Sequence, residues 1–354
     1  MDEIQNTRKY RLLVVAPQGI HLRNFLRRIE SETSAVHLIT TEKSGTDYDE
    51  TLLDFSFKQL QNFWKTPRAI RAVAKTFKPD VVHVHQLNSI SYFAVNGMKG
   101  LGIPVCATAW GSDVLVNPEK SSTHKRILRY VLNQADAFTA DSKEVAEKMK
   151  SMVKKELRIS LCNYGADKPS ISMPKENIIY SNRLHDPLYR IDKVIRAFAK
   201  INQQGDQGTW KLIIAGTGSQ SNSLKSLVSE LGIAQHVEFQ GWVQKEQNER
   251  NYARAKVWVS IPESDATPIS LLEAMYHGCY PIVSDLSSLR EWITESENGT
   301  LVRNVDEPFF DGVLNEINPE IATSNRELVE AKGSGKAAAL CFSRLHRSLI
   351  STAN

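Results

Sequence analysis

Short apolar runs alternate along this chain with longer segments of helical periodicity, and this alternation constrains the fold more than any other feature of the sequence. The apolar runs are rich in Val, Ile and Leu, which is typical of strands buried on both faces of a parallel sheet. The segments between them repeat apolar residues at three-to-four spacing, as covering helices do. The pattern therefore predicts an α/β chain built from repeated βαβ units. The predicted strands are residues 11–17, 35–40, 80–85, 103–109, 137–141, 158–163, 177–182, 210–216, 236–241, 257–262 and 280–285. The predicted helices include residues 21–29, 63–78, 124–132, 191–201, 223–232, 246–255, 269–278 and 336–350.

The predicted strands fall into two groups, and 354 residues are enough for two domains of ordinary size. We expect an N-terminal Rossmann-like domain at residues 1–168 and a C-terminal Rossmann-like domain at residues 169–334. The final segment, residues 335–354, predicts a helix that could pack back on the first domain. Because open parallel sheets bind ligands at the carboxyl ends of their strands, two facing domains predict a site in the cleft between them.

Hydropathy and cysteine spacing indicate the compartment. No window reaches the roughly 20 apolar residues that a membrane span needs, and the start of the chain is polar where a signal peptide is apolar. We expect a cytoplasmic protein, one that could also work at the inner face of the membrane. The cysteines lie far apart with no C-x-x-C pair, so buried thiols are expected rather than a zinc site or a disulfide framework. They are Cys106, Cys162, Cys279 and Cys341.

Positive charge is concentrated in the first half of the chain. Residues 1–170 hold 25 Lys and Arg against 18 Asp and Glu, whereas the remainder holds 19 against 22. Three basic stretches, residues 21–29, 63–78 and 124–132, have amphipathic helical spacing. They are interpreted either as ordinary solvated helix faces or as a surface for anionic lipid or a pyrophosphate-bearing acceptor. Nucleic acid is not an expected partner, because the basic runs lack interleaved aromatic residues and the net charge is only +4.

The stretch 257–285 carries the most chemical information. A strand ends, a polar loop follows, and a helix opens near Pro268, where proline suits the first turn because no N–H is needed there. The turn formed by Thr267, Pro268, Ile269 and Ser270 is a predicted phosphate site, because its free backbone N–H groups and the helix dipole favour an anion. Asp265 and Glu273, eight residues apart, could accept hydrogen bonds from sugar hydroxyls. The alternative is a capped helix with two incidental acids.

The same stretch resembles the E-x7-E segment of retaining glycosyltransferases of GT-B fold, in particular the family 4 class, through the Glu-Ala-Met of LLEAM at 273–275. The resemblance extends over about residues 10–305. In the second half, residues 163–167, 178–198 and 212–243 resemble the interdomain turn, the Arg-containing strand and loop, and the Gly-x-Gly turn of that family. In the first half, the resembling segments are residues 80–85, 109–113 and 136–149.

This resemblance implies a donor site in the second domain. Arg183 and Arg190, with Lys193 as the alternative to Arg190, would stabilise the departing diphosphate together with the helix amides. Glu273 would bind the ribose hydroxyls and Asp265 the hydroxyls of the donor sugar. The turn glycines Gly216, Gly218 and Gly241 would lie on the donor side.

The resemblance implies an acceptor side in the first domain, formed by Gly19, His21, Trp110 and Asp113. The chain departs from the family pattern at three positions: Asp265 replaces the usual Glu, Tyr189 the usual Lys, and Trp110 the His of many relatives.

The implied activity is retaining, metal-independent transfer of a sugar from a nucleotide-diphosphate sugar to a glycan or lipid-linked acceptor in surface polysaccharide assembly. No cofactor is implied. Asp47 and Asp49 form a D-x-D sequence, but two carboxylates supply too few oxygens to predict a metal site. His83 and His85 alternate along a very apolar strand and are expected to line the core. Two other functions stay open: a nucleotide-sugar epimerase of the same fold, and a non-catalytic subunit that binds nucleotide sugar.

Overall fold

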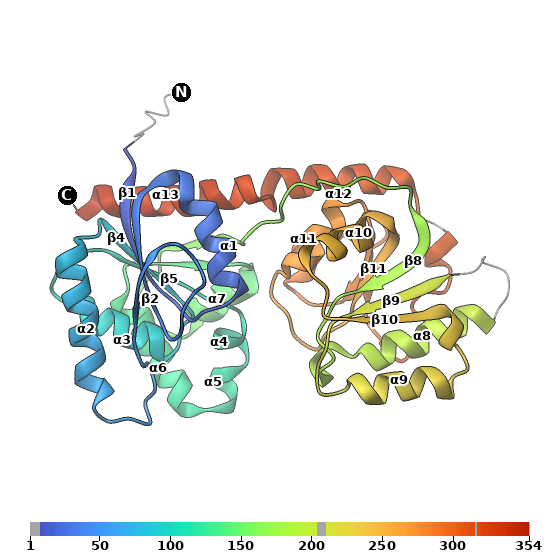
Figure 1. The fold of residues 1–354 in the computed structure, drawn as a ribbon, viewed down its shortest axis with the longest axis horizontal. Helices are drawn as coiled ribbons and strands as arrows, with labels where there is room; N and C mark the ends of the chain where they lie inside the picture. Colours follow the sequence, from blue (N-terminus) through green and yellow to red (C-terminus); the bar gives the residue numbers. More distant parts are fainter. Residues whose placement is uncertain (1–7, 204–209, 316, 354) are drawn as a thin grey trace. The chain divides into compact units, whose positions relative to one another are not determined.

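The computed structural model describes residues 8–203, 210–315 and 317–353, and its contacts divide the chain into two compact units (Figure 1). The first unit comprises Met1–Tyr164 with Ala338–Asn354, and the second comprises Gly165–Ala337. The chain passes between units a few residues before the predicted boundary at 168 and a few after the predicted boundary at 334. Each unit is an α/β layer structure with an entirely parallel sheet, which confirms the predicted α/β class.

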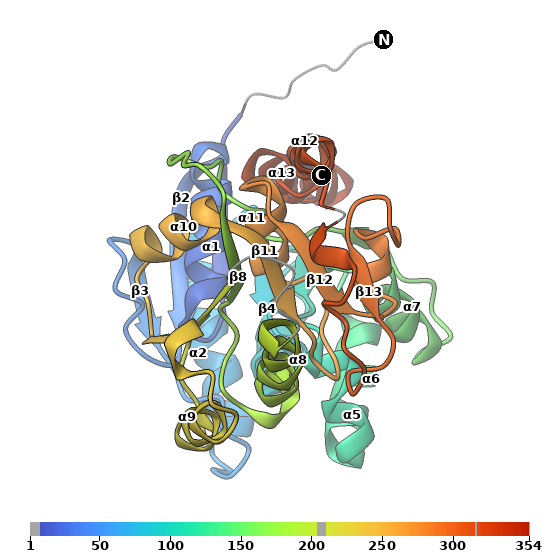
Figure 2. The ribbon, with the colours of Figure 1, turned by 90° about the vertical axis from the view of Figure 1, so that its right-hand side faces the viewer.

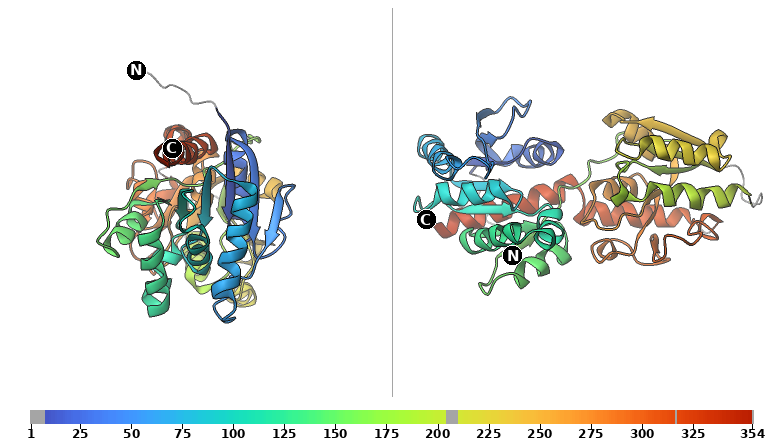
Figure 3. Two further views of the ribbon diagram at one scale, coloured as in Figure 1. Left: turned by 90° about the vertical axis from the view of Figure 1, so that its left-hand side faces the viewer. Right: turned by 90° about the horizontal axis from the view of Figure 1, so that it is seen from below.

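The first unit has a seven-stranded sheet in the order β3-β2-β1-β4-β5-β6-β7. Its central strands are almost completely buried, which explains their continuous apolar sequences. Figure 3 shows helices on both faces of this sheet. The strands are β1 (Tyr10–Val15), β2 (Thr33–Thr40), β3 (Asp49–Leu52), β4 (Val81–His85), β5 (Val105–Thr108), β6 (Ala137–Ala140) and β7 (Ile159–Leu161). The helices are α1 (Ile20–Ile29), α2 (Asn62–Phe77), α3 (Ser89–Met98), α4 (Ser112–Leu115), α5 (Asn117–Lys120), α6 (Ser122–Gln134), α7 (Lys143–Ser151) and the greater part of α13 (Gly335–Ala353).

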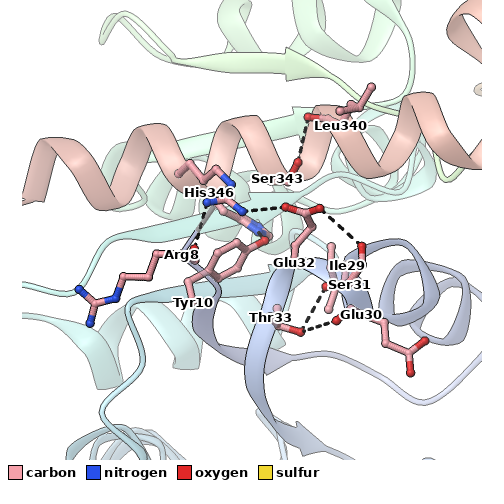
Figure 4. Close-up of polar contacts among 11 residues, drawn as sticks. Arg8, Tyr10, Ile29, Glu30, Ser31, Glu32, Thr33, Leu340, Ser343 and His346 are labelled. Atoms are coloured by element: carbon pink, nitrogen blue, oxygen red, sulfur yellow. Dashed lines mark hydrogen bonds and ion pairs between the residues drawn. The ribbon is translucent and has the colours of Figure 1, made fainter. Parts of the chain in front are cut away.

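The C-terminal helix α13 is joined to the first sheet by a chain of buried hydrogen bonds. The Tyr10 hydroxyl lies 2.8 Å from His346 Nδ1, and His346 Nε2 lies 2.7 Å from His83 Nδ1. His83 continues the chain through Nε2 to the Thr108 hydroxyl, 2.5 Å away. Burial lowers the pKa of His346 to about 3, so this histidine is neutral at physiological pH and can both donate and accept. Figure 4 shows Tyr10 and the neighbouring residue Glu32 beside this helix.

His83 and His85 are fully buried, which confirms that they line the core. Their rings stack at a centroid distance of 4.7 Å, and both contact Phe25 of α1. Phe25 also packs edge-on against Phe342 of α13 at 5.1 Å. Helices α1 and α13 therefore cover the sheet face on which these two histidines lie.

Two of the four cysteines form a disulfide, between Cys162 after β7 and Cys341 in α13. The prediction of free thiols was wrong for this pair, and it is confirmed for Cys106 and Cys279, which are free and buried. The pair is separated by 179 positions in sequence, and its Cα atoms lie 5.8 Å apart only because α13 returns to the first unit. The spacing of the cysteines in the sequence does not predict that α13 returns to the first unit.

Replacing Cys341 with serine is expected to lower the free energy of unfolding by about 2–5 kcal/mol, since cross-links that close long loops restrict the unfolded chain most. Urea unfolding of the oxidised protein measures the loss. Dithiothreitol should destabilise the wild type by the same amount and leave the Cys341→Ser variant unchanged. Equal midpoints for the oxidised wild type and the variant would contradict a stabilising cross-link.

The second unit has a six-stranded sheet in the order β10-β9-β8-β11-β12-β13. Helices α8 and α9 lie on one face, and α10, α11 and α12 lie on the other (Figures 1 and 2). Alternate residues of β8 serve the two cores: Ile179 packs with α8 and α9, whereas Tyr180 packs with α10 and α11. The strands are β8 (Glu176–Ser181), β9 (Lys211–Ala215), β10 (Val237–Gly241), β11 (Ala255–Ser260), β12 (Tyr280–Ser284) and β13 (Thr300–Val302). The helices are α8 (Ile191–Gln203), α9 (Ser221–Glu230), α10 (Lys245–Arg254), α11 (Ile269–Tyr276) and α12 (Pro319–Lys332).

Every predicted strand overlaps an observed strand, and two observed strands were missed. The missed strands β3 and β13 are short, and each occupies an edge of its sheet. β3 is also polar and partly exposed, so it has no apolar run. Within the described ranges, each helix falls short of the length or apolar character needed to cross a bilayer.

Candidate functional site in the second unit

The loops that leave β8, β9, β10 and β11 carry the predicted donor-side residues. Because β8 lies between β9 and β11, the loop containing Arg183 has the Gly216 turn on one side and the Asp265 loop on the other. Residues about 80 positions apart thereby become neighbours at the carboxyl edge of the sheet, where open α/β sheets bind ligands.

Arg183 is held at the start of α11 by three contacts. Its Nη2 donates to Asp265 Oδ2 at 2.6 Å, and its Nη1 donates to the Ser270 hydroxyl at 2.8 Å. Its guanidinium carbon lies 4.5 Å from the centre of the Tyr189 ring. The side chains of Arg183 and Asp265 are 12% and 20% exposed, so the pair is largely shielded from water yet still reachable. Burial raises the pKa of Asp265, and the adjacent Arg183 offsets part of that rise.

Tyr189, where the resemblance implied a departure from the usual lysine, supplies an aromatic face to Arg183 and no positive charge. Arg190 instead points to Glu263, with Nη2 and Oε1 3.2 Å apart, and Lys193 pairs with Asp306 at 2.6 Å. The structure therefore joins Arg183 to Asp265 and Ser270, but Arg190 and Lys193 have other carboxylate partners.

The first turn of α11 follows Pro268, whose extended backbone forms the N-cap. Thr267 accepts a hydrogen bond from the Trp292 indole at 3.1 Å, and Ser288 donates to the carbonyl of Asp265 at 2.7 Å. These contacts fix the loop before the helix. Pro268 itself makes no side-chain capping hydrogen bond, and the helix end places its partial positive charge beside Arg183.

Glu273 lies one helical turn beyond Ser270 and faces a pocket of about 280 Å³. Its Oε2 accepts a hydrogen bond from the Tyr252 hydroxyl at 3.0 Å. The same hydroxyl lies 3.3 Å from the carbonyl oxygen of Ser270, and it accepts from Asn182 at 2.7 Å. Ser270 therefore links the Arg183 cluster, through its hydroxyl, to the Glu273 cluster, through its carbonyl.

His277 and Glu249 also line the Glu273 pocket. The His277 ring stacks on Tyr252 at 5.6 Å, and burial lowers its pKa to about 4. Sequence reasoning missed Tyr252, His277 and Glu249. The only available signal was a tyrosine within an otherwise polar helix, which does not by itself indicate a site.

The turn glycines shape the backbone around Arg183. A Cβ atom at Gly216 would lie 2.5 Å from the Arg183 carbonyl oxygen, and one at Gly218 would lie 2.6 Å from the carbonyl of His185. The Gly216 amide also donates to the Gly241 carbonyl at 2.6 Å. These glycines allow the β9 turn to lie directly against the loop that carries Arg183.

In the first unit, Trp110 and His21 lie together at the carboxyl edge of the sheet. Their ring centres are 4.6 Å apart, and His21 lies 5.3 Å from Tyr164, which sequence reasoning did not single out. Burial lowers the pKa of His21. Gly19, with φ of 151°, begins the turn into α1, and an added Cβ there would meet no atom within 4 Å.

Asp113 is buried, with 2% of its surface exposed, and its carboxylate binds backbone amides. It accepts from the amide of Leu87 at 2.6 Å and from the amide of Trp110 at 2.9 Å. Burial raises its pKa to about 6, against the effect of these hydrogen bonds. Asp113 therefore ties the Trp110 loop to the end of β4.

Two family models match this chain. Glycosyl transferase 4-like matches residues 12–142, and Glycosyl transferases group 1 matches residues 166–314. The lipopolysaccharide 1,6-galactosyltransferase of Escherichia coli K12 is 24% identical over 310 residues, which cover 84% of this chain and 82% of that protein. An exopolysaccharide phosphotransferase of Streptomyces coelicolor is 34% identical over 138 residues, or 38% of this chain. That alignment spans only 14% of the Streptomyces protein. The alignment to an uncharacterized glycosyltransferase of Methanocaldococcus jannaschii spans only 28% of that relative.

Solved structures share the fold at low sequence identity. A glycosyltransferase from Rickettsia africae superposes with a TM-score of 0.80 at 15% identity, covering 97% of this chain and 99% of the other. Anabaena HepE, solved in complex with UDP and glucose, superposes with a TM-score of 0.78 at 11% identity, covering 96% of this chain and 100% of the other.

Proposed function

Because this chain belongs to the GT-B glycosyltransferases of the group 1 type, we propose that it is a retaining, metal-independent transferase that uses a nucleotide-diphosphate sugar. The observation that carries this proposal is the position of Arg183. Its guanidinium is fixed beside the N-terminus of α11 by Asp265 and Ser270. A guanidinium and a helix N-terminus side by side favour the negative charge that a departing diphosphate gains.

In the proposed step, the bond between the sugar C1 and the diphosphate oxygen breaks, and its electron pair stays with the diphosphate. The acceptor oxygen bonds to C1 on the same face, and its proton passes to the departing phosphate oxygen. Arg183 and the amides of residues 269 and 270 stabilise that oxygen. Arg190 and Lys193 add positive charge when they leave Glu263 and Asp306 for the diphosphate.

The remaining donor contacts follow from the two carboxylates. Glu273 accepts hydrogen bonds from the ribose hydroxyls in the pocket it lines, where Tyr252 orients it. Asp265 accepts from a donor-sugar hydroxyl and also positions Arg183. UDP is the first nucleotide to test, because HepE was solved with UDP and with UDP-glucose.

On the first unit, we assign the acceptor to the surface around Gly19, His21 and Trp110, with Asp113 as the positioning residue. A glycan or lipid-linked acceptor in polysaccharide assembly is in keeping with the similarity to the lipopolysaccharide galactosyltransferase of E. coli and the exopolysaccharide phosphotransferase of Streptomyces. We propose that the segment around the start of α2 contacts an anionic membrane. Leu60, Phe63 and Trp64 are 74%, 43% and 49% exposed there, beside the basic residues of α2.

UDP or GDP at about 100 times its dissociation constant is expected to raise the melting temperature by about 5–10 °C. EDTA should not reduce this shift, because the proposed diphosphate ligands are a guanidinium and amides. Thermal unfolding with and without each nucleotide makes the measurement. A shift that requires added manganese would contradict the metal-free site.

Turnover separates the two other functions from transfer. An epimerase would convert the donor sugar without a second substrate, and a non-catalytic subunit would bind donor without consuming it. Transfer to acceptor, or slow donor hydrolysis in its absence, supports the transferase. Both should fall by about 100- to 1,000-fold in Arg183→Ala.

A further inference from the structure

A second cavity lies at the opposite edge of the second sheet, among the amino ends of its strands. It encloses about 570 Å³, within the size range of small-molecule sites. Lys175 immediately precedes β8, Trp210 precedes β9, Lys256 is the second residue of β11, and Tyr280 begins β12. The N-terminal half of α12 forms another wall. The predicted donor site instead lies where the same strands end.

Three cationic side chains line this cavity, and the lining includes no carboxylate among the described residues. Each cation contacts neutral atoms. Lys175 Nζ donates to the carbonyl oxygens of Tyr252 and Ala255, both at 2.8 Å, and Lys256 Nζ donates to Asn177 Oδ1 at 2.6 Å. Arg326 Nη2 lies 3.5 Å from the carbonyl oxygen of His277.

Other cations of the second unit do lie in ion pairs. Arg183, Lys193, Lys245 and Arg254 each pair with a carboxylate. The three cavity cations have no such partner in the described part of the chain, so no described carboxylate competes with an anionic ligand for them. Burial lowers the pKa of Lys175, and the nearby positive charge of Arg326 lowers it further.

Much of the remaining lining is apolar. Leu314, Tyr280 and Trp210 are buried, and Ile321 and Ala322 of α12 face the same space. Gly278 has a φ of 75°, and a Cβ atom there would lie 2.5 Å from Arg326 Nη2. The missing side chain therefore lets the guanidinium lie directly over the backbone at the cavity wall.

We propose that this cavity is a second binding site, for an amphiphilic organic anion whose phosphate or carboxylate head pairs with Lys256 and Arg326 and whose apolar part lies against Leu314 and Ile321. Lys175 contributes charge from the cavity floor, since its amino group is occupied by carbonyl oxygens. The ligand is an anion because Lys256 and Arg326 offer charged donors and the described lining residues include no carboxylate. It is amphiphilic because Leu314 and Ile321 in the same lining are apolar.

Isothermal titration calorimetry with the full chain tests this site, using octyl phosphate, octanoate, inorganic phosphate and octanol as probes. Octyl phosphate is expected to bind at least 10-fold more tightly than either inorganic phosphate or octanol. Lys256→Met and Arg326→Gln should each weaken octyl phosphate binding at least 10-fold. Lys225→Met, which removes an exposed lysine of α9, is the matched control and should leave binding unchanged.

Ala322→Leu fills the cavity while keeping its charges, and it should abolish binding if the apolar part enters. Glu273→Ala should retain octyl phosphate binding, because Glu273 lies at the other edge of the sheet. Octanol binding as tightly as octyl phosphate, or unchanged affinity in both charge variants and in Ala322→Leu, would overturn the proposal. Tight binding of inorganic phosphate alone would show a simple phosphate site and would overturn the amphiphilic assignment.

Discussion

Replacing Arg183 with alanine is expected to reduce kcat for sugar transfer by about 100- to 1,000-fold, the loss typical of removing one preorganised donor from a developing oxyanion. The guanidinium is already held by Asp265 and Ser270 at the start of α11, so it need not reorganise when the diphosphate departs. The measurement is steady-state release of nucleoside diphosphate from the donor that gives the largest thermal shift. Arg183→Lys retains the charge but loses the two-pronged geometry, so an intermediate loss is expected.

Folding must be separated from chemistry in this variant. Removing Arg183 leaves Asp265 without its cation in a largely buried position, which destabilises the loop. Arg183→Ala combined with Asp265→Asn removes both charges and should recover stability without recovering turnover. Arg190→Ala is the comparison at a more exposed cation and should cost less than Arg183→Ala. Turnover of Arg183→Ala within threefold of wild type would refute the proposed role.

Replacing Glu273 with alanine is expected to weaken nucleoside diphosphate binding by about 10- to 150-fold, since hydrogen bonds to a charged group contribute about 1.5–3 kcal/mol. The carboxylate already has the Tyr252 hydroxyl as one partner and faces the pocket of about 280 Å³. Calorimetric titration with UDP and GDP gives the affinities. The thermal shift produced by the nucleotide should disappear with the affinity.

Two variants show whether the charge or the shape of Glu273 matters. Glu273→Gln keeps the volume and should lose less affinity than Glu273→Ala. Tyr252→Phe removes only the hydroxyl that orients the carboxylate, so we expect a loss of up to about 10-fold. Undiminished nucleotide affinity in Glu273→Ala would place the ribose elsewhere.

Only those features of the candidate site that depend on neighbouring residues in the sequence could be predicted. The segment from Pro268 to Glu273 is a local pattern of turn, helix start and carboxylate, and its structure follows that pattern. The engagement of Arg190 with Glu263 could not be predicted, because it depends on the loop conformation around Arg190, which has a φ of 51°. The burial of Asp113 was missed for a similar reason, since its partners are backbone amides at two separate loops.

The sequence by itself determined the α/β class, the positions of the long strands and helices, and the helix start at Pro268, because each depends on periodicity or turn chemistry within a few neighbouring residues. The tertiary structure alone decided the Arg183–Asp265 pair, the Cys162–Cys341 disulfide and the hydrogen-bonded chain through His346. All three join residues separated by more than 80 positions. Their partners are selected by strand order and by the return of α13, and no local pattern of residue types encodes either.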